Sequence, residues 1–172
     1  MATTAGGTPY VESSDLVADY PTVSLALAEH IDDLPAAVLQ IVRATDTTDR
    51  STTSATFVDV TGMSVTITPQ KSDSAILILC FFSGQLNTTA GFRTANYQIT
   101  DSSDNAISGA SNAQLYSDAE IILPISLLAY ATPATTSAVT YKLRFSVQSP
   151  ATNQIRNSSN SVGQLYAIEV SA

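Results

Sequence analysis

The sequence predicts a mainly β protein: a jelly-roll-like antiparallel β-sandwich of about eight strands, preceded by a short helical N-terminal arm. Three observations predict this fold class. From Val38 onward, short segments rich in β-branched and aromatic residues recur with turn signals between them. Several of these segments alternate apolar and polar residues. Residues 1–37, by contrast, carry six carboxylates, no Lys or Arg and one helical pattern. We therefore divide the chain into an arm, residues 1–37, and a β-sandwich domain, residues 38–172.

The arm contains one predicted amphipathic helix, at residues 22–33. Its apolar residues recur at helical spacing and form a single stripe: Val23, Leu27, Ile31 and Leu34. Pro35 follows directly, and the residue before a proline disfavours helical conformation, so the helix ends there. A helix this short is marginal alone in water. It therefore needs a packing surface, which could be the chain's own β-domain, a symmetry mate or a host particle.

The first half of the β-domain predicts a strand at 38–44, a polar loop at 45–55, and a strand at 57–68. In the second strand, residues 63, 65 and 67 are apolar and alternate with Ser and Thr, and Gly62 indicates a bulge or a tight bend. Residues 69–73 predict a turn. The segment AILILCFFS (75–83) is apolar on both faces, which is typical of a central strand of a packed sheet.

The second half predicts strands at 91–100, 113–117, 119–130, 137–149 and 164–172, with a short one around Ala106-Ile107. Pro124 interrupts AEIILPISLLAY, which favours a bent or edge strand there. In 137–149 the odd-numbered residues from Val139 to Val147 share one apolar face, and Lys142 and Arg144 lie on the other. The last strand places Leu165, Ala167 and Glu169 opposite Tyr166, Ile168 and Val170.

Composition excludes several kinds of partner and location. The net charge of −8 argues against nucleic-acid binding and against an anionic membrane surface, and favours a basic surface on another protein. No run of apolar residues approaches the ~18 that a membrane-spanning helix needs. The N-terminus has neither a basic nor an apolar signal region, so we expect no secretory leader. The single cysteine, Cys80, excludes an internal disulfide, and its apolar context indicates a buried small hydrophobe rather than a reactive thiol.

The sequence contains few side chains that could catalyse a reaction or bind a metal ion. We therefore expect that the protein is not an enzyme and that it has no cofactor and no metal site. His30 is the only histidine and lies on the arm, where a catalytic triad would have to recruit it from outside the β-domain. One His and one Cys do not make a transition-metal site. The chain has no Trp, which removes the usual stacking platform of a glycosidase. The loop 101–105 (DSSDN) is interpreted as a solvated turn, with a weak divalent-cation site as the alternative.

Two stretches resemble virion proteins of tailed bacteriophages. The first is TPYVESSDLVADYPTVSLALAEHID in the arm, where similar text precedes a fibre or decoration domain. The second runs from VLQIVRA to AILIL and contains FVDVTGMSVTITP, similar to β-sandwich domains of phage fibres. Together they cover roughly residues 8–80. The resemblance implies homotrimers, an N-terminal docking segment and an exposed distal domain. The chain lacks the long shaft of a full tail fibre, which favours a capsid decoration protein or a short fibre.

The leading hypothesis is thus a non-enzymatic component on the outer surface of the virion. The arm would dock on phage capsid or tail proteins through its apolar side chains: Tyr10, Leu16, Val17, Tyr20, Val23, Leu27 and Ile31. The sandwich would form a trimer, because AEIILPISLLAY exposes apolar residues that need cover. The alternative is a receptor-binding tail-fibre module. Its loops at one end of the sandwich, at 84–91, 101–112 and 150–162, would grip a host surface glycan or protein.

Overall fold

The computed structural model describes residues 2–3, 9–10, 25, 38–89, 91–110 and 112–171. By their internal packing the residues form two compact units, Met1–Ala36 and Ala37–Ala172. In the first unit, the two-residue strands β1 (Ala2–Thr3) and β2 (Pro9–Tyr10) pair antiparallel. Leu25, in the segment predicted to be helical, has helical conformation and is 58% exposed. The other residues of the predicted helix lie outside the described residues.

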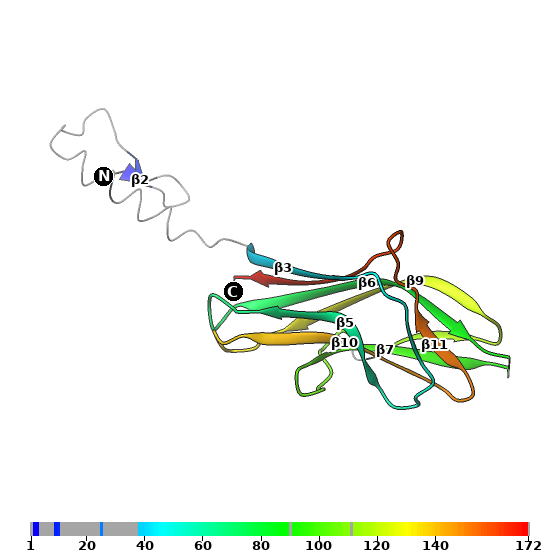
Figure 1. The fold of residues 1–172 in the computed structure, drawn as a ribbon. Coiled ribbons are helices and arrows are strands. Elements are labelled where there is room, and N and C mark those ends of the chain that lie inside the picture. Colours follow the sequence, from blue (N-terminus) through cyan, green and yellow to red (C-terminus); the bar gives the residue numbers. More distant parts are fainter. Residues whose placement is uncertain are drawn as a thin grey trace. The chain divides into compact units, whose positions relative to one another are not determined.

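The second unit consists of two antiparallel sheets, drawn as two layers in Figure 1. The four-stranded sheet has the order β5-β10-β7-β8, formed by β5 (Val58–Ile67), β10 (Val139–Val147), β7 (Arg93–Asp101) and β8 (Ala113–Ser117). The six-stranded sheet is formed by β3 (Val38–Asp46), β12 (Gly163–Val170), β6 (Ala75–Asn87), β11 (Thr152–Ile155), β4 (Arg50–Thr52) and β9 (Ile121–Ala131).

The pairing of the eight long strands is that of a jelly roll. Taken in chain order, the first pairs with the last (β3 with β12), the second with the seventh (β5 with β10), the third with the sixth (β6 with β9), and the fourth with the fifth (β7 with β8). One long antiparallel hairpin is thus rolled so that alternate pairs fall in opposite sheets. The predicted antiparallel sandwich is confirmed.

The strongest sequence patterns locate the strands correctly. β6 is the central strand of its sheet, because β12 and β11 pair along one of its edges and β9 along the other. Gly62 adopts a φ of 90°, and the pairing of β5 with β10 shifts register opposite it, which confirms the predicted bulge. β9 pairs only with β6, so it is the predicted edge strand.

Four local predictions were wrong. The loop predicted at 84–91 begins with the last four residues of β6, which extends to Asn87. The loop predicted at 45–55 contains the end of β3 and all of β4, and the loop predicted at 150–162 contains β11. β4 and β11 are polar, so their sequences lack the apolar alternation that marks a strand. They are regular because β11 pairs with β6 and β4 pairs with β11. The short strand predicted at Ala106-Ile107 is a single bridge between Thr100 and Ala106.

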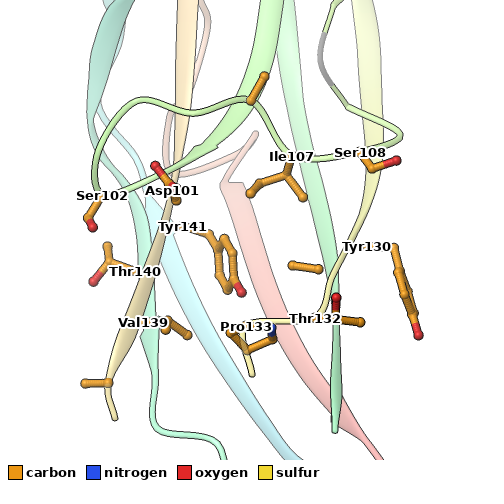
Figure 2. A pocket seen from close by; sticks show the side chains of 13 residues that line it. Asp101, Ser102, Ile107, Ser108, Tyr130, Thr132, Pro133, Val139, Thr140 and Tyr141 are labelled. Atoms are coloured by element: carbon orange, nitrogen blue, oxygen red, sulfur yellow. The ribbon is translucent and has the colours of Figure 1, made fainter. Parts of the chain in front are cut away.

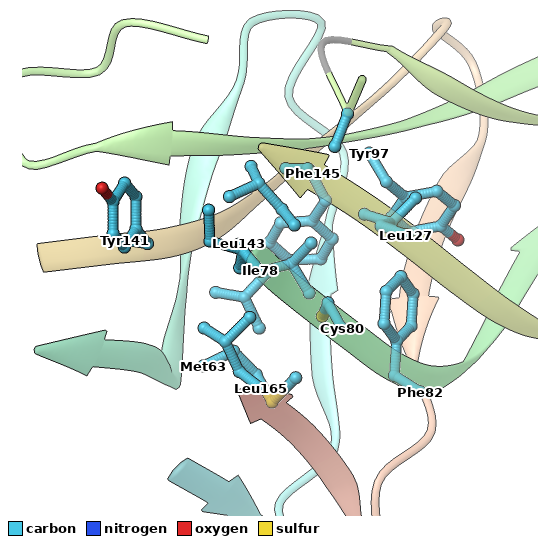
Figure 3. Packing of buried hydrophobic residues seen from close by; sticks show 14 of the residues in the cluster. Met63, Ile78, Cys80, Phe82, Tyr97, Leu127, Tyr141, Leu143, Phe145 and Leu165 are labelled. Carbon is cyan, nitrogen blue, oxygen red and sulfur yellow. The ribbon is translucent and has the colours of Figure 1, made fainter. Parts of the chain in front are cut away.

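The core lies between the two sheets and is formed by the inward side chains of both (Figure 3). β10 contributes Tyr141, Leu143, Phe145 and Val147, all at most 3% exposed, as its alternation predicted. Cys80 is fully buried, as expected, and its burial raises the pKa of its thiol well above the ordinary range. The folding free energy therefore comes from the inner faces of the two sheets.

One buried polar group, the carboxylate of Glu169, connects elements that are distant in sequence. Glu169 of β12 is fully buried and accepts four hydrogen bonds. Its Oε1 accepts from Ser74 Oγ (2.6 Å) and from the backbone N–H groups of Gln70 (2.8 Å) and Lys71 (3.2 Å), and its Oε2 accepts from Gln40 Nε2 (2.5 Å). Burial by itself raises the pKa of Glu169, but these hydrogen bonds outweigh it and hold the pKa below the usual range.

Candidate interaction surfaces

The outer face of the six-stranded sheet is apolar where β3, β12, β6 and β9 lie side by side. Strand register places its outward side chains in rows that cross the four strands. The first row runs through Ile41, Ile168, Leu77 and Tyr130. Ile41 is 61% exposed and Tyr130 is 53% exposed. A row of four apolar side chains facing solvent across four strands is unusual for a solvated sheet.

Two further rows extend this surface. The second runs through Arg43, Tyr166, Leu79 and Leu128, of which Leu128 is 56% exposed. The third consists of Thr45, Gln164, Phe81 and Ser126. A shallow groove lies between Ile41 and Phe81, and a second hollow continues past Phe81 along β9. We call these three rows, and the fourth formed by Ser83 and Pro124, the apolar outer face. Arg43 is the one charged side chain in its four rows.

The outer face of the four-stranded sheet has the opposite character. At its centre, Lys142 and Arg144 of β10 each form ion pairs with the same two carboxylates. Lys142 Nζ lies 2.9 Å from Asp59 and 2.6 Å from Asp104, and Arg144 lies 2.8 Å from Asp59 and 3.2 Å from Asp104. The hydrogen bond from Lys142 lowers the pKa of Asp104, and hydrogen bonds to Asp104 and Asp59 raise the pKa of Lys142. The centre of this face is polar and its charges are paired, whereas Tyr116 of β8 and Phe92, stacked on each other, are exposed away from that centre.

The free edge of β9 is protected against pairing with another strand. The N–H of Tyr130 donates to the carbonyl of Ser108, and Gly109 lies against the carbonyl of Leu128, so the loop after β7 covers one end of this edge. The backbone N–H groups of alternate residues point to the same edge of a strand. The N–H of Tyr130 points to the free edge of β9, so position 124, six residues earlier, also faces this edge. Pro124 therefore removes no hydrogen bond between β9 and β6. The edge therefore does not favour strand addition, whereas the outer face beside it stays open.

One end of the sandwich holds a cavity of about 420 Å³ between the sheets (Figure 2). Ile107, Val139 and Tyr141 form an apolar wall, and Asp101 and Ser102 stand at its rim. Burial, reinforced by the negative charge of Asp101, raises the pKa of Tyr141 to about 12, so the phenol keeps its proton at neutral pH. The cavity offers hydroxyl and carboxylate groups beside apolar surface, which is the chemistry that a small polar ligand uses.

The three predicted binding loops do not share one end of the sandwich, contrary to expectation. Loop 101–112 borders the cavity beside Val139, where β10 begins. Loops 84–91 and 150–162 meet at the opposite end, where β10 has ended and Thr88 and Pro150 line a common hollow. Antiparallel pairing explains the separation, since β7 carries the chain from one end to the other between loops 84–91 and 101–112.

The turn at 101–105 is held by its own hydrogen bonds. Asp101 Oδ1 accepts from the backbone N–H groups of Ser103 (2.8 Å) and Asn105 (2.9 Å), and Oδ2 accepts from Asn105 Nδ2 (2.9 Å). The hydrogen bond from the Asn105 side chain is the main cause that lowers the pKa of Asp101. Among the described residues, no group of three or more His, Cys, Asp or Glu is placed to hold a metal ion.

The predicted docking residues remain predictions. The side chain of Tyr10, and Leu16, Val17, Tyr20, Val23, Leu27 and Ile31, lie outside the described residues. His30, the one candidate for acid–base chemistry, also lies outside them. Across the described part of the chain, no helix combines the length and apolar character needed to cross a membrane. Sequence reasoning identified exposed apolar residues on β9 but missed the rest of the apolar outer face, because its rows join strands from both ends of the β-domain.

Comparison with known proteins gives structural similarity at low identity. No protein-family model and no curated protein matches the chain. Among solved structures, a D431N mutant VP2 protein of infectious bursal disease virus in T=1 particles matches with a TM-score of 0.34 and 15% identity over 81% of this chain. The structure of the Gx strain of that virus matches with a TM-score of 0.36 and 14% identity over 80%. This chain covers 37% and 38% of those two chains. At such TM-scores the similarity carries no inference about function.

Proposed function

We propose that this chain is a non-enzymatic structural protein of a bacteriophage particle, either a capsid decoration (cement) protein or a short fibre. In this proposal the arm docks on capsid or tail proteins, and the jelly-roll domain assembles with copies of itself as a homotrimer on the outer surface of the virion. The observation that carries the proposal is the apolar outer face, which is surplus to folding and suits a protein that works in contact with others.

Three further points support a structural role. The arm combines six carboxylates with an apolar stripe, so a partner surface with basic residues around an apolar patch would complement it. The described side chains form ion pairs and hydrogen bonds with one another, and no group of three or more His, Cys, Asp or Glu among them is placed to hold a metal ion. Jelly rolls recur in viral capsid domains, although this is an analogy at the level of fold and not of site. The phage context itself comes from the resemblance of residues 8–80.

The test is incorporation into particles. A chain lacking residues 1–35 is compared with the full chain, and with a full-length Val23→Asp/Leu27→Asp variant that places two charges on the predicted stripe. We expect both altered chains to keep the circular dichroism spectrum of a β-domain and to lose particle binding. Ser24→Asp/Ala28→Asp adds the same charge between the stripe residues and serves as the control. Unimpaired incorporation of the shortened chain would remove the docking mechanism.

A receptor-binding module is the second candidate, and the cavity beside loop 101–112 favours it. Tyr141, Asp101 and Ser102 present hydrogen-bonding groups next to an apolar wall, as a glycan-binding site would. In this case purified protein binds host cells, and Ser102→Trp, which fills the rim, abolishes binding without affecting incorporation into particles. Strong particle binding with no binding to cells would favour decoration.

A further inference from the structure

We infer that the apolar outer face of the six-stranded sheet is the surface on which copies of this chain pack against one another. This inference deepens the self-association in the proposed function and does not depend on the virion role. The occupant is thus a second copy of the same chain. The face is built from four strands, β3, β12, β6 and β9, and is centred on Leu79 and Tyr166, which lie directly opposite each other in register.

Charge supports a copy of the chain as the partner. The chain carries a net charge of −8, of which −6 lies on the arm and −2 on residues 38–172, so the arms of two copies repel each other strongly and the β-domains only weakly. The apolar outer face adds no negative charge, because its rows contain no carboxylate and one cation, Arg43. Two copies can approach through this face with the least like-charge repulsion. A strongly basic partner, in contrast, would find no carboxylate there to pair with.

The size of the face suits a specific but reversible contact. Four strands about 4.8 Å apart, crossed by four rows about 6.7 Å apart, present roughly 500 Å² per copy. Two packed faces therefore bury about 1,000 Å² in total, near the lower limit for a specific interface. Sheets pack face to face at about 10 Å with interdigitated side chains, a geometry that a continuous apolar face permits. We expect association that depends on protein concentration in the micromolar range.

The contrast between the two sheets shows that apolar outer residues are not a general property of this chain. On the four-stranded sheet the corresponding central positions hold Lys142 and Arg144, paired with Asp59 and Asp104. A jelly roll requires apolar residues only on its inner faces, and both sheets supply those. Ile41, Leu128 and Tyr130 remain more than half exposed in the single folded chain, and they become buried when a second copy covers them.

Sedimentation velocity of the full chain tests this inference. The wild-type chain is expected to sediment as an oligomer that dissociates on dilution. The Ile41→Glu/Leu128→Glu variant places one carboxylate at each side of the face, on residues that are exposed in the single chain. We expect it to be monomeric at concentrations at least tenfold above the wild-type dissociation midpoint. The Ser64→Glu/Gln114→Glu variant adds the same charge to exposed positions of the other sheet and should associate as the wild type does.

Folding is checked by circular dichroism, and Ile41→Thr/Leu128→Thr provides an uncharged variant that places β-branched side chains, which suit a strand, at both positions. It should also weaken association by at least tenfold. A wild-type chain that is monomeric throughout, including one whose face is covered by its own arm, overturns the inference, as does an oligomer that both face variants leave unchanged. A dimer broken by these variants supports the inference while removing the trimer from the proposed function. Loss of particle incorporation is measured separately and tests docking.

Discussion

Glu169 is the residue whose replacement most directly tests the physical account of this fold. It is fully buried, yet four donors converge on its carboxylate from three separate segments: Ser74, the turn at Gln70 and Lys71, and Gln40 on β3. In the Glu169→Gln variant the amide oxygen can replace Oε1, but the new NH2 group then faces the Nε2 of Gln40. Gln40 cannot turn its amide to accept without losing its 2.6 Å hydrogen bond to the Thr68 carbonyl.

The variant therefore loses one hydrogen bond and the charge that strengthens the other three. A hydrogen bond to a charged group contributes about 1.5–3 kcal/mol, and a neutral one about 0.5–1.5 kcal/mol. We expect Glu169→Gln to lower the free energy of unfolding by about 2–3 kcal/mol at pH 7. For a domain of this size that corresponds to roughly 6–12 °C in the unfolding midpoint. Urea denaturation followed by circular dichroism measures the difference.

The pH dependence has a defined sign. The folded-state pKa of Glu169 lies below its ordinary value of 4.5, so the unfolded chain binds the proton more readily. The stabilisation is therefore fully present above pH 4.5 and is lost as the pH falls through the folded-state pKa. The difference between wild type and Glu169→Gln should shrink over that range. Asp73→Asn removes one charge from an exposed position in the same turn and is the control. Equal midpoints at pH 7, or a difference that does not diminish in acid, would refute this reasoning.

Three other substitutions or measurements address the interior. Gly62→Ala places a Cβ about 2.9 Å from Asp46 Cγ at a φ of 90°, so urea denaturation should show a loss of about 1–3 kcal/mol. Tyr97→Phe leaves the buried Asn153 Oδ1 without its 2.7 Å hydrogen bond and should cost about 1–2 kcal/mol in the same assay, and an unchanged midpoint would contradict the bond. Burial raises the pKa of the Cys80 thiol, so a thiol reagent should modify it at the rate of unfolding, and rapid labelling of the native chain would contradict its burial.

The parts of the fold that the sequence predicted are those in which local pattern and burial coincide. Alternation in 137–149 identified the inward face of β10, and apolar residues on both faces identified β6 as central. Glu169 shows the limit of this reasoning. Its alternation placed it on the same face as Leu165 and Ala167 without indicating which face is buried, and its partners come from residues 95 to 129 positions away and have no local signal. β4 and β11 were missed for the same reason, since their regularity comes from pairing across 100 residues.

The cavity and the apolar outer face differ in how much of each could be predicted from the sequence. Loop 101–112 was recognised as a polar connection, and it borders the cavity. Val139 and Tyr141, which also line the cavity, lie beside this loop because β10 pairs antiparallel with β7. The apolar outer face is harder to foresee. Ile41 and Leu128 belong to one face only because β12 and β6 pair between β3 and β9, and this strand order is a property of the topology.

The six-stranded sheet is apolar on both faces. Different residues therefore stabilise the folded chain and the association of copies. Residues of the inner faces, such as Ile78, stabilise the single chain, because they are buried once the sheets meet. Residues of the outer face, such as Ile41 and Leu128, are more than half exposed in it and contribute little to that step. Substituting the first group should lower stability at any protein concentration. Substituting the second should matter only where copies associate, because these exposed side chains gain their burial from that contact.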